Sequence, residues 1–118
     1  MTYDYRLAER IRGLLLSEAG VTEVKMFGGL TFMVNGNMAC GITKDDLMLR
    51  VGEERFQEAL SKPHARPMDF TKRPMIGMVY VSPQGCAAKE DLRRWVDLAV
   101  DFARALPPKR PKGDGKPR

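Results

Sequence analysis

An Asn-Gly dipeptide at residues 35–36 lies between two apolar, β-compatible runs, residues 24–34 and 38–43. This dipeptide favours a type I′ hairpin turn, because both central residues of that turn need a positive φ. A second tight connection at Lys44-Asp45 leads into residues 47–51, where apolar side chains alternate as they do in a half-buried strand. Strands joined by tight turns are antiparallel, so the three runs predict a three-stranded meander and exclude a doubly wound α/β fold.

Helical periodicity predicts three helices around this meander. The first carries its apolar residues between Leu7 and Leu15 and has a glycine, Gly20, where a helix end belongs. A short second helix follows Gly52, with acidic residues in its first turn. The third and longest helix spans about residues 88–106 and ends at a pair of prolines.

Two further stretches predict strands. Residues 77–83 contain a short β-compatible run, and the proline-punctuated loop at residues 63–74 contains a candidate edge strand at residues 68–70. The predicted fold class is therefore α+β. It consists of an antiparallel sheet, the meander plus one or two further strands, packed with an N-terminal, a short middle and a long C-terminal helix.

The charge of the chain is concentrated at its C-terminal end. The 118 residues carry a formal net charge of +5, of which residues 107–118 supply +4, with five basic residues and one acidic residue. The remaining +1 on residues 1–106 is too little for the electrostatic footprint of a DNA-binding domain. We therefore expect one folded domain at residues 1–106 and a disordered basic Pro/Gly-rich tail at residues 107–118. The tail adds at most a weak, salt-sensitive contact with nucleic acid.

Neither a secretory signal nor a membrane span is predicted, because no apolar run is long enough for either. The expected compartment is the cytoplasm, and no membrane partner is expected. The two cysteines, Cys40 and Cys86, are far apart in the sequence, which fits reduced thiols in that compartment.

Gly28 and Gly29 raise the possibility of a phosphate-binding loop. They lack the G-x-G-x-x-G order, and a strand-like run follows them rather than the helix whose N-terminus would bind a phosphate. We interpret these glycines as a β-bulge, or as a place where another backbone comes close.

Cys40, Cys86 and His64 are the residues that suggest a thiol nucleophile with its base, or a set of metal ligands. Cys40 falls within a predicted strand and suits a small core residue, because free cysteine is among the most buried residue types. Cys86 precedes a predicted helix, where either ordinary packing or a lowered thiol pKa is possible. We expect no catalytic residue, no cofactor and no metal. The alternative is a small ligand-binding protein or thiol enzyme with a site near Cys40 and His64.

Two features suggest a surface for a macromolecular partner. Eight methionines either fill an irregular core or leave an adaptable protein-binding surface. The loop after the second helix is locally basic, and it is either a solvated loop or a contact surface for an acidic partner or phosphate. The residues of this possible interaction surface are His64, Arg66, Met68, Lys72 and Arg73.

Four segments in this order carry a resemblance to a known family: "KMFGGLTFMVNGNMACGI", "DDLMLRVG", "HARPMDF" and "RPMIGMVYV". Together with a long amphipathic helix on each side, they resemble the N-terminal domain of the TfoX/Sxy competence-regulator family over residues 1 to about 106. The resemblance implies an α+β fold and marks six residues as structural, with no catalytic role. They are Met26, Phe27, Gly28, Gly29, Asn35 and Gly36.

The resemblance also implies a class of function. The best-known members help to switch on DNA-uptake genes alongside a cyclic-AMP-responsive transcription factor, and they carry a second, helical domain where this chain has a short basic tail. We expect a stand-alone, non-enzymatic interaction or regulatory module that acts through a protein partner such as transcription machinery. An exposed sheet edge also allows a homodimer.

Overall fold

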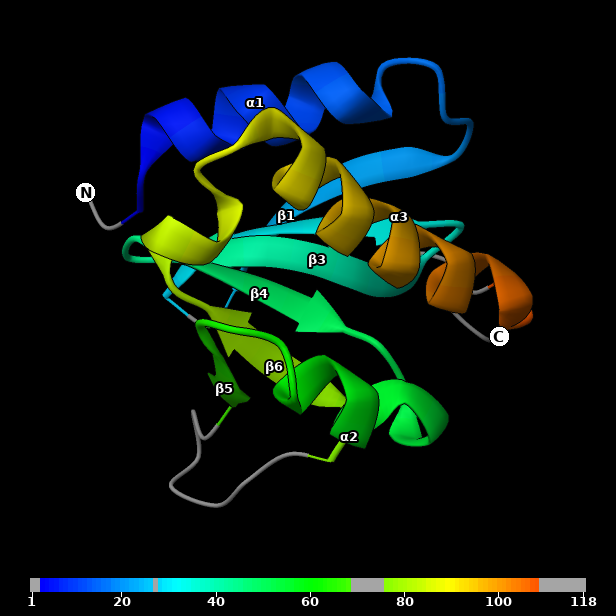
Figure 1. The fold of residues 1–118 in the computed structure, drawn as a ribbon. Coiled ribbons are helices and arrows are strands. Elements are labelled where there is room, and N and C mark those ends of the chain that lie inside the picture. Colours follow the sequence, from blue (N-terminus) through cyan, green and yellow to red (C-terminus); the bar gives the residue numbers. More distant parts are fainter. Residues whose placement is uncertain (1–2, 27, 69–75, 109–118) are drawn as a thin grey trace.

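The computed structural model describes residues 3–26, 28–68 and 76–108. These residues form one six-stranded sheet with three α-helices and a short 3-10 helix, so the predicted α+β class is confirmed (Figure 1). In chain order the elements are α1 (Tyr5–Leu15), β1 (Val21–Met26), β2 (Gly29–Val34), β3 (Asn37–Thr43), β4 (Asp46–Arg50), α2 (Glu53–Leu60), β5 (Ala65–Pro67), β6 (Met78–Val81), η1 (Pro83–Cys86) and α3 (Lys89–Ala105).

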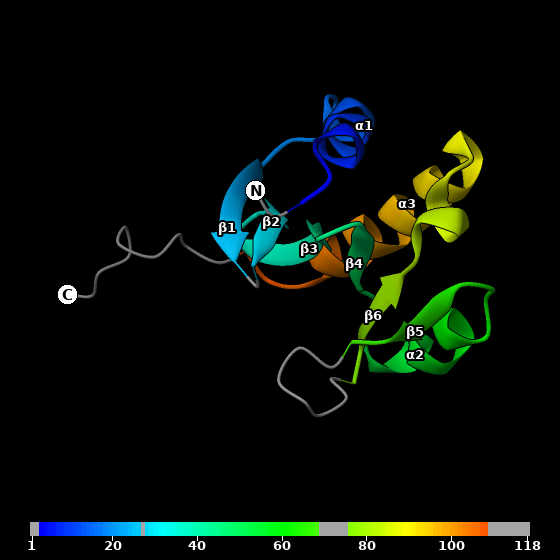
Figure 2. The ribbon, with the colours of Figure 1, turned by 90° about the vertical axis from the view of Figure 1, so that its left-hand side faces the viewer.

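The sheet has the order β1-β2-β3-β4-β6-β5, and every neighbouring pair is antiparallel. Consecutive tight turns build the first four strands as a meander, one strand longer than predicted. The helices lie on one side of the sheet, as the two views at right angles show (Figure 2). The chain therefore forms two layers, with the main core between the sheet and its helices.

Strand alternation sends apolar side chains to both faces of the sheet. Successive strand partners place two rows of residues against the helices, and these rows belong to the main core. The rows are Leu30, Ile42, Leu47 and Val81, then Phe32, Cys40, Leu49 and Val79. A smaller buried cluster lies on the opposite face and contains Met48, Met68, Met78 and Tyr80. The interpretation of methionines as core filling is therefore confirmed at these three positions.

The turn at Asn35-Gly36 has the predicted type I′ geometry. Asn35 has φ 53° and Gly36 has φ 82°, so both central residues adopt the positive values that this turn requires. The N–H of Asn35 also donates a hydrogen bond to the carbonyl of Gly20, at 2.9 Å, which ties this turn to the loop after α1.

The prediction of one continuous strand over residues 24–34 is wrong, and the prediction of an edge strand at residues 68–70 falls mostly outside the described residues. The run at residues 24–34 is two strands, β1 and β2, so Gly28 lies in a turn with φ 73° instead of a bulge. The predicted close approach is confirmed next to it, because a Cβ on Gly29 would collide with the carbonyl oxygen of Ile42. The edge strand is Ala65–Pro67, ahead of the predicted residues 68–70, of which 69 and 70 lie outside the described residues.

Candidate functional site

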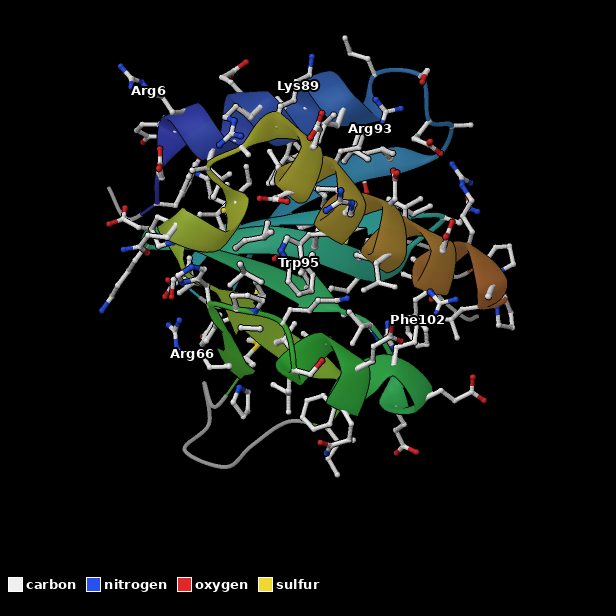
Figure 3. The ribbon with its side chains drawn as sticks, in the orientation of Figure 1. Arg6, Arg66, Lys89, Arg93, Trp95 and Phe102 are labelled. Atoms are coloured by element: carbon white, nitrogen blue, oxygen red, sulfur yellow. The ribbon has the colours of Figure 1, made fainter. Side chains whose placement is uncertain are left out.

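An open groove lies between α2 and α3, beside the turn that leads from α2 into β5. Its volume is about 650 Å³. One wall is formed by Glu58 of α2 and by Pro63 and His64 of the turn, while η1 contributes Gln84. The other wall is a stripe along α3, where Trp95 is labelled in Figure 3. Residues of α2, the following turn, η1 and α3 therefore build this site, and no described side chain of β1, β2 or β3 lines it.

Helical spacing explains why α3 forms both a core face and a groove wall. The groove stripe recurs every three or four residues, which places its members on one side of the helix. It consists of Asp91, Arg94, Trp95, Leu98 and Asp101. The neighbouring stripe, which includes Leu92, Val96 and Ala99, is buried against the sheet. Trp95 lies at the boundary between the two and keeps 7% of its surface exposed.

The rim of the groove carries more acidic than basic side chains. Its carboxylates are those of Glu58, Asp91, Asp97 and Asp101, and its cations are Lys62 and Arg94. Two carboxylates are paired along α3: Asp91 contacts Arg94 at 3.3 Å, and Asp97 contacts Arg93 at 3.9 Å. Glu58 and Asp101 have no ion pair within the described part of the chain. The groove thus combines an apolar floor, formed by Trp95 and Leu98, with two carboxylates that have no ion pair among the described residues.

The structure does not bring Cys40 and His64 together as a nucleophile and its base. Cys40 is fully buried on the helix side of β3, and burial raises the pKa of its thiol to about 12. His64 is exposed on the turn after α2, where it has φ 70° and lies against Gly85 of η1. A thiol with such a pKa stays protonated at neutral pH and is a poor nucleophile.

Cys86 is buried as well, and the lowered pKa considered for it is wrong. Burial raises the pKa of the Cys86 thiol, and this effect exceeds the opposing attraction of the Arg10 charge. The thiol points back to the carbonyl of Ser82, with a sulfur–oxygen distance of 3.8 Å. Helix-entry packing is therefore the role that the structure assigns to this residue. Within the ranges that the structure describes, no three His, Cys, Asp or Glu side chains converge as metal ligands.

The five residues of the predicted interaction surface have different environments. Arg66 lies over the ring of Tyr80 at 5.0 Å, pairs with Asp46 at 2.6 Å and donates to the Ser82 hydroxyl at 3.1 Å. His64 is exposed at the groove, whereas Met68 is fully buried on the far face of the sheet. Lys72 and Arg73 lie outside the described residues.

The six motif residues occupy the meander, away from the groove. Met26 ends β1, Gly28 and Gly29 lead into β2, and Asn35 and Gly36 join β2 to β3. Phe27 lies outside the described residues. None of the described motif residues lines the groove, so their roles in the structure are those of turns and a close strand contact.

Sequence reasoning did not find the groove. It assigned Trp95 to the apolar face of the last helix and treated the α2 region only as a short helix. The available signal was the stripe of charged residues beside Trp95 and Leu98 on α3, but the opposing wall comes from residues about thirty positions earlier in the chain. Only the tertiary arrangement joins these walls.

Comparison with protein families gives a decisive match. The family model of the TfoX N-terminal domain matches residues 14–103, from within α1 to near the end of α3. The chain belongs to this family. The curated proteins and the solved structures yield no match to it. The matched residues include the meander and the groove of this TfoX N-terminal domain, whereas the basic residues 107–118 lie beyond them.

The helices of the structure were compared with the requirements for crossing a membrane. Within residues 3–26, 28–68 and 76–108, no helix has the length and apolar character needed to cross a bilayer.

Proposed function

We propose that this TfoX N-terminal domain is a non-enzymatic interaction module that acts by binding a protein partner in the groove between α2 and α3. The observation that carries the proposal is the combination, in one open groove, of an apolar floor at Trp95 and Leu98 with a charged rim. Tryptophan is enriched among the residues that dominate binding energy, and apolar anchors surrounded by polar groups are typical of partner-binding pockets.

The environment of the thiols supports a non-enzymatic role. Both side chains are buried, and burial raises the pKa of each, so neither Cys40 nor Cys86 is prepared for nucleophilic attack. His64 is the one histidine of the chain, and its exposed position on the groove suits a contact with a partner. The alternative of a thiol site near Cys40 and His64 therefore has no geometric support.

We also propose that the domain has a regulatory role, which it exerts through contacts with proteins. The resemblance to competence regulators supports a partner in the transcription machinery. The acidic rim supports a protein over a nucleic acid in this groove, because the carboxylates of Glu58 and Asp101 repel phosphates. Influence on transcription would then pass through the partner.

The proposal is tested by one substitution in the groove and a matched one outside it. Leu98→Gln keeps a similar side-chain size and a similar preference for helix, and it removes apolar character from the floor. Leu16→Gln makes the same change on a leucine that is 84% exposed and is not among the groove-lining residues. Each protein is immobilised, and the proteins that it retains from cell extract are identified and quantified by mass spectrometry.

We expect a partner that the native chain and Leu16→Gln retain equally and that Leu98→Gln loses. With the purified partner, loss of one well-packed anchor weakens binding by about tenfold or more. Retention of the same proteins by all three chains, with equal affinities, would place the partner surface elsewhere and contradict the groove.

A further inference from the structure

The two edges of the sheet differ in how they are protected. Figure 2 shows β1 at one end of the sheet and β5, beside α2, at the other. No described strand lies beyond either of them. An edge strand presents backbone N–H and C=O groups with which another strand can pair, and proteins usually protect such edges. The protection of each edge therefore indicates whether it is available as an interface.

The β5 edge is protected. The N–H of Met68 donates to the carbonyl of Met78, at 3.1 Å, so the alternation of an antiparallel ladder turns the backbone groups of two β5 residues outward. These residues are Ala65 and Pro67. Proline has no N–H, and the N–H of Ala65 donates to the carbonyl of Lys62, at 3.4 Å. Neither outward position of this three-residue strand therefore offers a donor to another strand.

The β1 edge has no such protection. The hydrogen bond from the N–H of Asn35 to the carbonyl of Gly20 fixes the alternation, which turns the N–H and C=O groups of three β1 residues away from β2. These residues are Val21, Glu23 and Lys25. The strand is six residues long and contains no proline. Within the described part of the chain, the outer side of β1 is therefore open to pairing with another strand.

The side chains of β1 favour one antiparallel register with a second copy of the strand. A two-fold axis at Glu23 would place like charges opposite each other, which is unfavourable. An axis at Thr22 would leave Lys25 beyond the end of the other strand. An axis at Val24 places Glu23 of each copy opposite Lys25 of the other, and it brings together the two Val24 side chains, each 40% exposed. Because Lys25 has no ion pair within the described residues, charge complementarity favours the axis at Val24.

We propose that the chain forms a two-fold dimer in which β1 pairs antiparallel with β1 of a second copy, with the axis at Val24. On each side of the axis, Glu23 and Lys25 exchange backbone hydrogen bonds and form an ion pair across the interface. The two six-stranded sheets become one continuous sheet, with the helices of both copies on the same side. No described side chain of β1 lines the groove, so this inference does not depend on the proposed function.

Sedimentation velocity of the full chain tests whether the dimer forms. Pairing of one short strand gives a small interface, so we expect a weak dimer that is half-formed at a protein concentration between about 10 µM and 1 mM. High salt should weaken the dimer, because its ion pairs are exposed to solvent. A chain that stays monomeric up to about 1 mM in low salt would overturn the proposal.

A proline substitution tests the edge itself. Lys25→Pro removes an N–H that points away from β2, so it gives β1 the protection that Pro67 gives β5 and leaves the hydrogen bonds within the sheet intact. It should weaken dimerisation by about tenfold or more, while circular dichroism shows that the fold is retained. Lys25→Gln removes the same charge but keeps the N–H, and it should weaken the dimer less. Dimerisation of Lys25→Pro with native affinity would place the interface elsewhere and contradict the proposal.

Paired charge reversals test the register. In Lys25→Glu two glutamates face each other on each side of the axis, and in Glu23→Lys two lysines do. Each variant alone should therefore dimerise about tenfold more weakly than the native chain, or worse. An equimolar mixture of the two variants restores oppositely charged pairs on both sides, so it should form a heterodimer of nearly native affinity. If the mixture associates no better than either variant alone, this register is wrong.

Amide hydrogen exchange of the native chain tests the same pairing without any substitution. The N–H groups of Thr22 and Val24 point towards β2 and should be protected at every protein concentration. Those of Glu23 and Lys25 point outward and should exchange rapidly in dilute protein. Their exchange should slow as the concentration rises and the dimer forms. If the exchange of these two amides does not depend on concentration while the chain dimerises, β1 is not the interface and the proposal fails.

Discussion

Two regions of the molecule differ in how their sequence relates to their role. They are the glycine-rich hairpins of β1, β2 and β3, and the groove between α2 and α3. The hairpins contain the residues that most suggest a functional site when the sequence is read alone. These are the paired glycines, the Asn-Gly step and a cysteine. The structure uses these residues for backbone geometry and core packing. The groove consists of residues that are unremarkable in sequence, yet it is where an apolar floor and a charged rim meet. The distinctive residues of the hairpins therefore serve the conformation of the backbone. The candidate site forms only because the fold brings residues of separate elements together.

The largest expected effect is on the reaction rates of the two thiols. A reactive cysteine in the hairpins would contradict the view that the hairpins serve only backbone geometry and core packing. We expect Cys40 in the native protein to react with a disulfide reagent at least about 1,000-fold more slowly than in denaturant, because reaction requires opening of a core with a stability of 5 kcal/mol or more. Cys86 lies in a short 3-10 helix and should react faster than Cys40. Single-thiol chains made by Cys86→Ala and Cys40→Ala allow the two rates to be measured separately.

The pH dependence of stability checks the same thiol independently. The folded-state pKa of Cys40 lies above its ordinary value of 9.0, so the neutral buried thiol contributes stability that is complete below pH 9 and is lost as the pH rises towards 12. The stability advantage of native protein over Cys40→Ala should therefore shrink over that interval in denaturant titrations. A rapid native reaction, or an advantage that is constant with pH, would show that Cys40 is accessible.

The next largest effect is expected at Gly29, where the hairpin permits no side chain. In Gly29→Ala the new Cβ meets the carbonyl oxygen of Ile42, a backbone atom that cannot turn aside. We expect the free energy of unfolding to fall by about 3 kcal/mol, the upper range for overpacking of a close contact. Urea titration followed by circular dichroism measures this change.

Two other glycines serve as controls that separate collision from backbone strain. Gly28 has open space around its Cβ position but a φ of 73°, so Gly28→Ala should lower the free energy of unfolding by only about 1 kcal/mol. Gly13 lies within α1 and also has open space, so Gly13→Ala should raise it by about 0.5–1 kcal/mol. If the two substitutions lowered the free energy of unfolding equally, backbone strain in the turn, and not the collision with Ile42, would account for the loss at Gly29.

The origin of each element explains how far sequence reasoning succeeds. Asn35-Gly36 determines its turn through its own φ preferences, and α3 follows from a periodic apolar pattern, so both were predictable locally. The division of residues 24–34 into two strands was missed, because a turn at Gly28 depends on one positive φ that a strand bulge also accommodates. The groove was beyond reach for a different reason. Its two walls are remote in sequence, and each wall alone reads as the polar side of a helix.

A smaller effect is expected when the groove floor itself is changed. Leu98 is only partly buried, and it packs at the margin of the core. Leu98→Gln should therefore lower the free energy of unfolding by about 1 kcal/mol or less, and Leu16→Gln should change it by less than about 0.5 kcal/mol. Thermal and urea unfolding measure both values. A loss near that of Gly29→Ala would mean that Leu98 belongs to the core, and partner loss in this variant would then reflect unfolding.

The smallest effect is expected at the ion pair that joins the hairpin edge to α1. Arg12 contacts Glu23 of β1 through two hydrogen bonds, at 2.7 Å and 2.8 Å, and also contacts Glu9. These hydrogen bonds from Arg12, chiefly, hold the pKa of Glu23 below its usual value of 4.5. A carboxylate with a lowered folded-state pKa contributes stability above the unfolded value, and that stability is lost as the pH falls through the folded value.

Glu23→Gln should therefore lower the free energy of unfolding by no more than about 1 kcal/mol at pH 7, because the pair is exposed to solvent and screened. The difference from native protein should disappear as the pH falls through the lowered folded-state pKa of Glu23, and it should shrink in high salt at pH 7. Glu9→Gln, on the more exposed partner of Arg12, provides the matched control and should change the stability less. If Glu23→Gln instead matched Gly29→Ala at pH 7, edge charges would hold the hairpins as strongly as backbone contact does. The hairpins would then depend on surface charge as much as on backbone geometry and core packing, and the contrast with the charged groove would fail.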